Sequence, residues 1–258
     1  MAQATQLTPK GERTREHILD IALGLFIEQG YDATTMRDIA AAAPLPLIVD
    51  GDNGYGDVKN VVRMVRTYEA MGITALIIED QVSPKSCGHM SVSHQVVPVE
   101  VAEAKLAAAL DARRGTGLAI IARTDARSVE GLEAALERGR RYVAQGVDAL
   151  FIEAPTSIEE LKLIGQSFDV PLLANALEAG KTPVLSPAQY RELGFSLVIY
   201  TTSLLLRMIS TLTRTLSALR QGQLLDVGPL PDFQELTRIM GMSDWIEIEQ
   251  KFAMKPRA

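Results

Sequence analysis

Leu118-Ala-Ile-Ile-Ala-Arg-Thr-Asp125 is an apolar run whose carboxyl end turns polar. Five further runs of the chain share this pattern, namely Leu45–Asp52, Ala75–Asp80, Ala149–Ala154, Val170–Ala176 and Leu197–Thr202. Short runs that are nearly continuous in apolar residues are typical of strands buried on both faces of a parallel sheet. The chain is therefore expected to contain six strands of this kind.

Amphipathic stretches with helical spacing separate the runs. They are Val58–Met71, Val99–Arg113, Val129–Gln145, Ile158–Gln166 and Pro187–Leu193. Strands that alternate with helices predict an α/β domain, which we assign to residues 44–225. The pattern indicates a (β/α)8 TIM-barrel type that lacks its first two βα units, because such a barrel has eight strands and six are visible.

Helices alone are expected at both ends of the chain. Apolar residues at helical spacing predict a helix over residues 12–29, and Thr35 begins a second one that stops before Pro44. Residues 1–43 therefore form a separate helical segment. Three further helices are expected in the tail, at Ser203–Arg220, Asp232–Met240 and Ser243–Phe252, and residues 226–258 form a C-terminal helical unit.

The composition excludes several classes of protein. With 258 residues, of which 47% are hydrophobic, the chain is globular rather than disordered. Its formal net charge of −6 argues against a nucleic-acid binder that works by charge. No apolar run approaches the roughly 20 residues that cross a bilayer, and residues 1–17 lack the apolar core of a secretion signal. Together with the single cysteine, Cys87, these features predict a cytoplasmic protein.

Carboxylates gather where the first two runs end. Because the carboxyl ends of parallel strands share one face, active sites are built there. Asp50 and Asp52 are two residues apart on the expected first strand, so both carboxylates should point the same way, and Glu79 adds a third. Oxygen ligands suit Mg²⁺ or Mn²⁺ better than zinc. We expect these three residues to hold a metal; the alternative is a solvated acidic rim.

The loop after the second run carries the only thiol. In Pro84-Lys-Ser-Cys-Gly-His89, Lys85 and His89 flank Cys87. Nearby positive charge lowers the pKa of a thiol, which makes Cys87 a candidate proton donor or acceptor; a lone cysteine is otherwise a small buried hydrophobe. Arg123 ends a buried run, where an arginine pairs with a carboxylate of the protein or of a ligand.

Five motifs make a more specific pattern: Leu47-Ile-Val-Asp-Gly-Asp-Asn-Gly-Tyr-Gly56, Ile78-Glu-Asp-Gln81, Pro84-Lys-Ser-Cys-Gly-His89, Ile121-Ala-Arg-Thr-Asp-Ala126 and Leu173-Ala-Asn175. Over about residues 45–225, the chain resembles the isocitrate lyase / phosphoenolpyruvate mutase superfamily, and within it the 2-methylisocitrate lyase branch. The resemblance implies Mg²⁺ held by Asp50, with Asp52 and Glu79 helping directly or through water. It also implies a homodimer or homotetramer in which tail helices swap between subunits.

The resemblance also implies the roles of the remaining site residues. The residues expected to act in catalysis are Cys87, Arg123, Lys85 and His89, with Cys87 as the acid/base. The residues expected to bind the small carboxylate substrate are Arg123, Glu153, Asn175, Gly88 and His89. The implied reaction is Mg²⁺-dependent cleavage of a carbon–carbon bond in methylisocitrate, isocitrate or a 2-alkylmalate, which yields an α-keto acid and a carboxylate.

Two features depart from the family pattern. Ser86 stands where the lyases usually carry Lys or Arg, and the first two βα units, which bring a Ser-Gly pair and a further Asp, have no counterpart. In their place, residues 11–43 resemble the opening of a TetR-type DNA-binding domain without its recognition helix. Because residues 1–43 carry more acidic than basic side chains, DNA binding is not expected.

Several alternatives remain open at this point. The same metal site could serve carboxyphosphonoenolpyruvate or phosphoenolpyruvate mutase chemistry, or the decarboxylation of oxaloacetate. From another class, the chain could be a TetR-like DNA-binding regulator with a barrel-derived ligand domain. It could also be an inactive truncated fusion, because motifs can persist in a fold that no longer catalyses.

Overall fold

A computed structural model of the chain describes residues 38, 46–85, 95–113, 115, 117–224, 228 and 230–252. Residues 46–207 form one compact unit, and residues 208–258 belong to a second. The expected helices within residues 1–43 fall outside the described residues, apart from residue 38. Among the helices that are described, none combines the length and hydropathy of a membrane span.

The first unit is built on a parallel sheet. Its strands are β1 (Ile48–Asp50), β2 (Ala75–Glu79), β3 (Ala119–Thr124), β4 (Ala149–Ile152), β5 (Leu172–Asn175) and β6 (Leu197–Ile199). All neighbouring pairs are parallel, and the strands lie in sequence order from β1 to β6. This arrangement confirms the predicted six-stranded α/β fold of barrel type.

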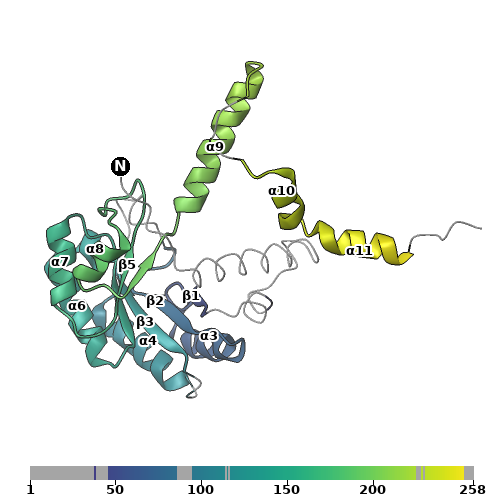
Figure 1. The fold of residues 1–258 in the computed structure, drawn as a ribbon. Coiled ribbons are helices and arrows are strands. Elements are labelled where there is room, and N and C mark those ends of the chain that lie inside the picture. Colours follow the sequence, from purple (N-terminus) through teal and green to yellow (C-terminus); the bar gives the residue numbers. More distant parts are fainter. Residues whose placement is uncertain are drawn as a thin grey trace, which may run out of the picture. The chain divides into compact units, whose positions relative to one another are not determined.

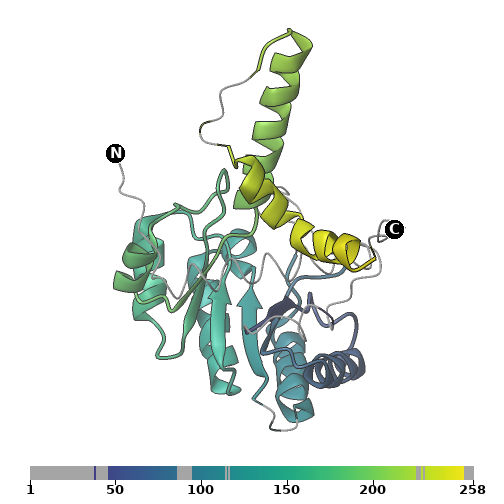
Figure 2. The same ribbon diagram turned by 45° about the vertical axis from the view of Figure 1, so that its right-hand side comes forward.

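Helices follow the strands and cover the outside of the sheet (Figures 1 and 2). They are α3 (Val58–Ala70), α4 (Val99–Ala112), α5 (Ala126–Val129), α6 (Leu132–Ala144), α7 (Ile158–Gln166) and α8 (Pro187–Glu192). The expectation of one helix over Val129–Gln145 was wrong, because Gly131, with a φ of +95°, separates α5 from α6. A positive φ is easy for glycine but breaks a right-handed helix.

Alternating strand residues build two layers of core, since successive side chains of a strand point to opposite faces. The layer on one face consists of Ala75, Ile77, Ile121, Ala149, Phe151 and Leu173. Leu76, Ile120 and Leu150, at the alternate positions, are fully buried. The buried strands therefore hold their polar carboxyl ends on a rigid base.

The sheet is not closed by the residues that the structure describes. Within that part of the chain, β1 and β6 each pair with one strand only. Two of the three residues of β1 are exposed. The predicted shortfall of two βα units therefore leaves both edges of the sheet without a partner strand among the described residues.

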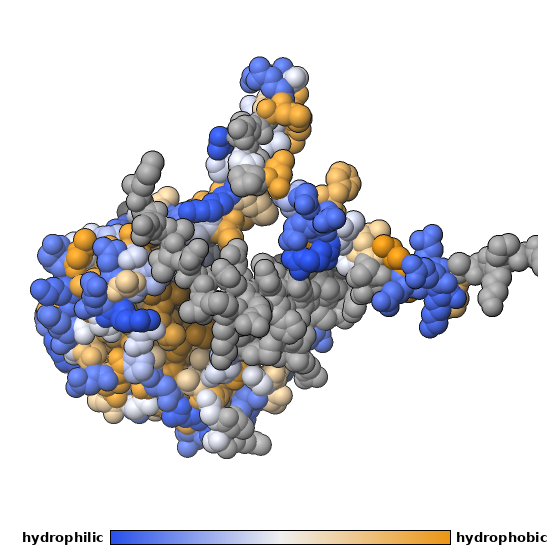
Figure 3. Space-filling view, in the orientation of Figure 1, coloured by the Kyte–Doolittle hydropathy of each residue, from blue (hydrophilic) through white to orange (hydrophobic). Residues whose placement is uncertain are grey.

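The second unit is helical. It contains most of α9 (Ser203–Arg220), together with α10 (Phe233–Ile239) and α11 (Met242–Phe252). Large hydrophobic side chains on these helices are exposed, and part of this surface is visible in Figure 3. They include Leu212, Leu216, Phe233, Trp245 and Phe252. The residues of this unit that the structure describes therefore form no core of ordinary size in a single copy.

Candidate active site

The polar strand ends meet at one edge of the sheet, as the parallel arrangement requires. Asp50 ends β1, Glu79 ends β2, Arg123 is the penultimate residue of β3, and Asn175 ends β5. Glu153 directly follows β4. Glu79 and Arg123 are partners in the register of β2 and β3, so neighbouring strands bring these opposite charges together.

Asp50 and Asp52 converge through a turn rather than along a strand. The expectation that both lie on the first strand was wrong, because β1 ends at Asp50 and Asp52 has a φ of +48°. The backbone N–H of Asp52 donates to Oδ1 of Asp50 at 2.9 Å. The backbone N–H of Glu79 donates to the carbonyl oxygen of Asp52 at 2.9 Å, which ties the turn to β2.

An ammonium group lies between the three carboxylates. Nζ of Lys85 forms an ion pair with Oδ1 of Asp52 and lies 3.5 Å from Oδ2 of Asp50 and 3.7 Å from Oε1 of Glu79. Burial by itself lowers the pKa of Lys85, but the hydrogen bond that it donates to Asp52 and the charges of the three carboxylates raise it. The pKa is raised overall, so Lys85 is a cation at neutral pH.

Glu79 is the most deeply buried of these carboxylates. Its side chain is 0% exposed, and neither of its oxygens has a hydrogen-bond partner among the described residues. Burial raises the pKa of Glu79 to about 7, against the opposing charge of Arg123. A buried carboxylate without hydrogen bonds is costly to ionise unless a cation compensates it.

The donor set fits a hard divalent cation. The three carboxylates offer oxygen ligands only, and Glu79 keeps both oxygens without hydrogen bonds. Among the described residues, however, no three His, Cys, Asp or Glu side chains are grouped closely enough to ligate a metal together. Mg²⁺ usually keeps several waters and binds one or two carboxylates directly. The arrangement therefore fits Mg²⁺ held in part through water.

Arg123 is fixed by a different carboxylate. Its Nε and Nη2 donate to Oδ2 and Oδ1 of Asp125 at 2.8 and 2.9 Å. The guanidinium also lies 3.5 Å from Glu79, 3.8 Å from Glu153 and 5.1 Å from the ring centre of Phe151. Burial by itself lowers the pKa of Arg123, but Asp125 and the other carboxylates raise it overall. Arg123 thus pairs with a protein carboxylate, which is one of the two partners expected for it.

Glu153 and Asn175 complete this side of the site. Nδ2 of Asn175 lies 3.4 Å from both carboxylate oxygens of Glu153, and the Thr201 hydroxyl donates to Oδ1 of Asn175 at 3.1 Å. Neighbouring strand ends therefore form a continuous polar rim. Cys87, Gly88 and His89 lie outside the described residues, so their predicted roles stay predictions.

Sequence reasoning missed a buried hydrogen-bond network around Asp80, which holds the residues that follow Arg123 in the chain. The carboxylate of Asp80 accepts hydrogen bonds from the Thr124 hydroxyl at 2.7 Å, the Asp125 backbone at 2.9 Å and the Tyr142 hydroxyl at 2.8 Å. Arg138 adds an ion pair at 3.4 Å. The available signal was the position of Asp80, directly after Glu79, where the side chain belongs to the opposite face of the strand.

A second missed residue is Lys105, which lies on the buried side of α4. Its Nζ donates to the carbonyl oxygen of Asn53 at 2.7 Å, and Nδ2 of Asn53 donates to the carbonyl oxygen of Gln81 at 3.3 Å. Burial lowers the pKa of Lys105. These bonds anchor the turn that carries Asp52 to α4 and to the end of β2.

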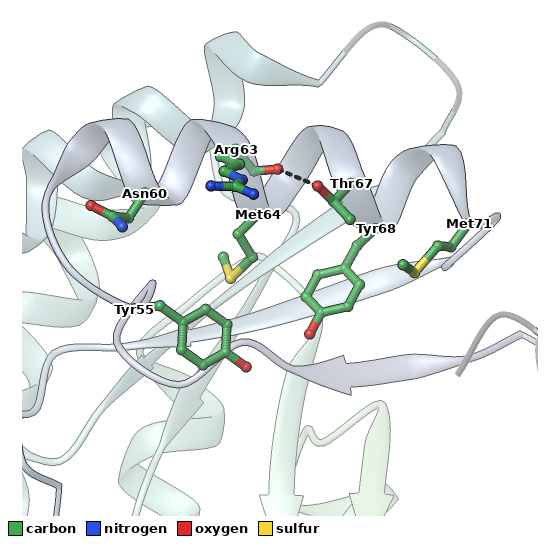
Figure 4. A pocket seen from close by; sticks show the side chains of 7 residues that line it. All are labelled: Tyr55, Asn60, Arg63, Met64, Thr67, Tyr68 and Met71. Carbon is green, nitrogen blue, oxygen red and sulfur yellow. Dashed lines mark hydrogen bonds between the residues drawn. The ribbon is translucent and has the colours of Figure 1, made fainter. Parts of the chain in front are cut away.

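A separate hollow lies along α3 (Figure 4). It has a volume of about 360 Å³ and is lined by Tyr55, Asn60, Arg63, Met64, Thr67, Tyr68 and Met71. The Tyr55 hydroxyl reaches the backbone oxygen of Asp50 at 3.5 Å. Because the lining contains none of the strand-end carboxylates, we place the active site at the strand ends instead.

Comparisons with known proteins agree with this fold. A family model described as "Phosphoenolpyruvate phosphomutase" matches residues 28–220. The chain is 38% identical over 217 residues to 2,3-dimethylmalate lyase of Eubacterium barkeri, covering 83% of this chain and 75% of the relative. It is 46% identical over 162 residues to 2-methylisocitrate lyase of Aeropyrum pernix, covering 63% of this chain and 52% of that enzyme.

Solved structures show the same fold. A structure of oxaloacetate acetylhydrolase with 3,3-difluorooxalacetate matches with a TM-score of 0.72 at 30% identity, covering 86% of this chain and 77% of that one. A structure of 2,3-dimethylmalate lyase, described as a PEP mutase/isocitrate lyase superfamily member, matches with a TM-score of 0.71 at 27% identity, covering 91% and 82%. The likeness of residues 11–43 to a TetR-type domain finds no support in these matches, and the family match already begins at residue 28. The chain belongs to the phosphoenolpyruvate phosphomutase family, within the PEP mutase/isocitrate lyase superfamily.

Proposed function

We propose that this protein is a carbon–carbon lyase that cleaves a 2-hydroxy di- or tricarboxylate, of the methylisocitrate, isocitrate or 2-alkylmalate class, to an α-keto acid and a carboxylate. The observation that carries the proposal is the convergence of Asp50, Asp52 and Glu79 on one cation beside Arg123. The names of the relatives, 2,3-dimethylmalate lyase and 2-methylisocitrate lyase, support the substrate class.

The two sides of the site divide the work of binding. Asp50 would hold Mg²⁺, with Asp52 and Glu79 helping directly or through water, and the ion when bound supplies Lewis-acid polarisation of a substrate oxygen. Asp125 occupies two of the five donors of the Arg123 guanidinium. The remaining N–H groups are left to bind the α-keto acid portion of the substrate and to stabilise negative charge on its oxygens.

The reaction itself breaks one carbon–carbon bond. The substrate hydroxyl transfers its proton to a base, either a side chain of the site or water, and becomes the carbonyl of the α-keto acid. The electron pair of the broken bond moves onto the departing fragment, which is an enolate-like carboxylate. In this proposal Cys87 donates a proton to the carbon atom of that fragment at which the bond was broken, which completes the carboxylate product.

One assay tests the proposed activity directly. The protein is incubated with 2-alkylmalates, isocitrate and methylisocitrate, and the release of pyruvate or glyoxylate is measured with Mg²⁺ and with a chelator. We expect Mg²⁺-dependent release from at least one member of the panel. No release from any member, from protein that is folded by circular dichroism, would overturn the proposal and favour the inactive truncated fusion.

The role of Cys87 has a separate test. Cys87→Ser replaces the thiol by a hydroxyl whose pKa is far higher, so turnover should fall by about 10²- to 10⁴-fold. Mg²⁺ binding, measured by calorimetry, should survive because the carboxylates are unchanged. Unchanged turnover would show that the proton comes from another group.

A second reaction class has support of its own. The matching family model is that of phosphoenolpyruvate phosphomutase, and matching structures include oxaloacetate acetylhydrolase. The same carboxylates and Arg123 would suit mutase chemistry on a phosphoenolpyruvate-like substrate, or the decarboxylation of oxaloacetate. Adding phosphonopyruvate and oxaloacetate to the panel separates these candidates, because each gives a different product.

We also propose that the enzyme is a cytoplasmic homodimer or homotetramer whose tail helices pack on a second copy. The hydrophobic residues exposed on α10 and α11, including Phe233 and Trp245, support packing against an apolar surface of a second copy. The single cysteine supports a reducing compartment. Light scattering should give a mass of twice or four times the 28.0 kDa of one chain. A monomer at micromolar concentration would contradict this assembly.

A further inference from the structure

We infer that Lys85 is an exchangeable counter-cation: its ammonium and a divalent metal ion compete for the same carboxylates, and metal binding releases the lysine. The inference rests on the proposed metal site and adds a role for one of its residues. It concerns the chain's own lysine, which contacts all three carboxylates at once.

The positions of the charges carry the first step. Asp50, Asp52 and Glu79 bring three negative charges together, and Lys85 lies among them with a direct ion pair to Asp52. Mg²⁺ binds carboxylate oxygens at about 2.0–2.1 Å, which is closer than an ammonium approaches. Two cations within a few ångströms repel each other strongly in a partly buried site. The ion and the ammonium therefore exclude one another.

Glu79 gives the second, independent observation. Both of its oxygens are buried and lack hydrogen bonds among the described residues, and the Lys85 ammonium is 3.7 Å away. That distance is too long for a hydrogen bond. Lys85 thus compensates the charge of Glu79 without satisfying its oxygens, and an ion or its bound water would do both. A hydrated metal ion therefore satisfies this cluster of carboxylates more completely than the lysine does.

The two nearby cations differ in their freedom to leave. The side chain of Lys85 is 39% exposed and has a flexible stem, so it can turn toward solvent. The side chain of Arg123 is 17% exposed and is held by both oxygens of Asp125. The exchange therefore takes place at Lys85, and Arg123 keeps its position.

The first experiment compares Mg²⁺ binding by titration calorimetry in the wild type, Lys85→Met and Lys162→Met. Lys162 is an exposed lysine on α7, so its loss matches the change in net charge without touching the cluster. We expect Lys85→Met to bind Mg²⁺ about tenfold more tightly or better. Lys162→Met should bind as the wild type does.

The second experiment uses the wild-type chain, so it holds even if Lys85→Met fails to fold. Lysines are reductively methylated with formaldehyde and borohydride, with Mg²⁺ or with a chelator, and the label on each is measured by mass spectrometry. A lysine released from the carboxylates is present more often as the uncharged amine that attacks formaldehyde, so labelling of Lys85 should rise severalfold with Mg²⁺ while that of Lys162 stays constant. A general charge effect would leave the labelling of Lys85 unchanged.

The outcomes separate the two proposals. Equal Mg²⁺ affinities with constant labelling of Lys85 would overturn the exchange and leave the metal site standing. Weaker binding by Lys85→Met would also overturn it, because the lysine would then assist the metal. Absence of Mg²⁺ binding in every variant would remove the proposed metal site and the exchange with it.

Discussion

The two halves of the strand-end site hold their positive charges in opposite ways. On the β1–β2 half, Lys85 lies among three carboxylates that come from a turn and a strand end, and it is partly exposed. On the β3–β4 half, Arg123 forms a two-point pair with Asp125, which is itself 0% exposed. One cation is loosely held, and the other is part of the buried framework.

This difference follows from the elements that carry each charge. Arg123 projects from a strand in the middle of the sheet, and Asp80 holds the neighbouring Thr124–Asp125 segment with two hydrogen bonds. Lys85 follows the isolated bridge residue Gln81 and belongs to no strand or helix. A rigid cation suits the orientation of a substrate, whereas a mobile one suits exchange with a metal ion.

The largest expected effect comes from removing the fixed cation. Arg123→Met leaves Asp125, Glu79 and Glu153 buried without their main counter-charge, so the free energy of unfolding should fall by about 3–5 kcal/mol. Urea unfolding followed by circular dichroism measures it. Arg140→Met is the matched control, because Arg140 pairs with the exposed Glu133 and Glu137 on α6. Equal losses in both variants would show that Arg123 is no more structural than a surface arginine.

The next effect depends on pH and concerns Glu79, which lies between the two halves. Its folded-state pKa is raised to about 7 from 4.5, so the folded chain keeps a proton that the unfolded chain has lost in this window. Stability without metal should therefore fall as the pH rises through it, by about 1.4 kcal/mol per pH unit at most.

Glu79→Gln removes the titrating carboxyl group and with it this contribution to the pH dependence of stability. In the presence of a chelator, the variant should gain stability relative to the wild type between pH 5 and pH 8, as thermal unfolding at both values would show. Parallel pH profiles for the two proteins would mean that Glu79 titrates normally despite its burial.

A smaller effect is expected from the hydrogen bond between Tyr142 and Asp80. Tyr142→Phe removes the hydroxyl that donates to Asp80 at 2.8 Å, and a hydrogen bond to a charged group contributes about 1.5–3 kcal/mol. The free energy of unfolding should fall by that amount, and Mg²⁺ affinity should not change because the Lys85 half is untouched. A loss of Mg²⁺ binding in this variant would mean that the two halves are coupled.

The fold could be predicted because its strands are buried on both faces. Runs such as Ala75–Glu79 are apolar up to a polar last residue. The apolar part predicts the strand, and the polar end predicts the edge of the sheet that carries the site. The same logic placed Asp50, Glu79, Arg123, Glu153 and Asn175 at one edge before any coordinates were known.

The details of pairing could not be predicted, since they depend on contacts between distant residues. Strand spacing suggested that Asp52 lies on β1, but the chain turns at Asp50, and a positive φ at Asp52 is invisible in sequence. The expectation that Lys85 flanks the thiol of Cys87 stays untested, because Cys87 lies outside the described residues. The sequence did not indicate that the Lys85 ammonium also lies among the carboxylates of β1 and the following turn. Asp80 and Asp125 directly follow their strands, and only their burial and hydrogen bonds reveal their roles.

The smallest effect is expected from removing the loosely held cation, and it is the sharpest test of the contrast. Lys85 is partly exposed, and ion pairs of this kind contribute about 0–1 kcal/mol, so Lys85→Met should lower the stability of the metal-free chain by no more than that. Salt screens exposed pairs far more than buried ones. The difference between wild type and Lys85→Met should therefore shrink as salt is raised, whereas the loss in Arg123→Met should persist. If both losses respond to salt alike, the two cations are held in the same way, and the division of the site into a fixed and an exchangeable half is wrong.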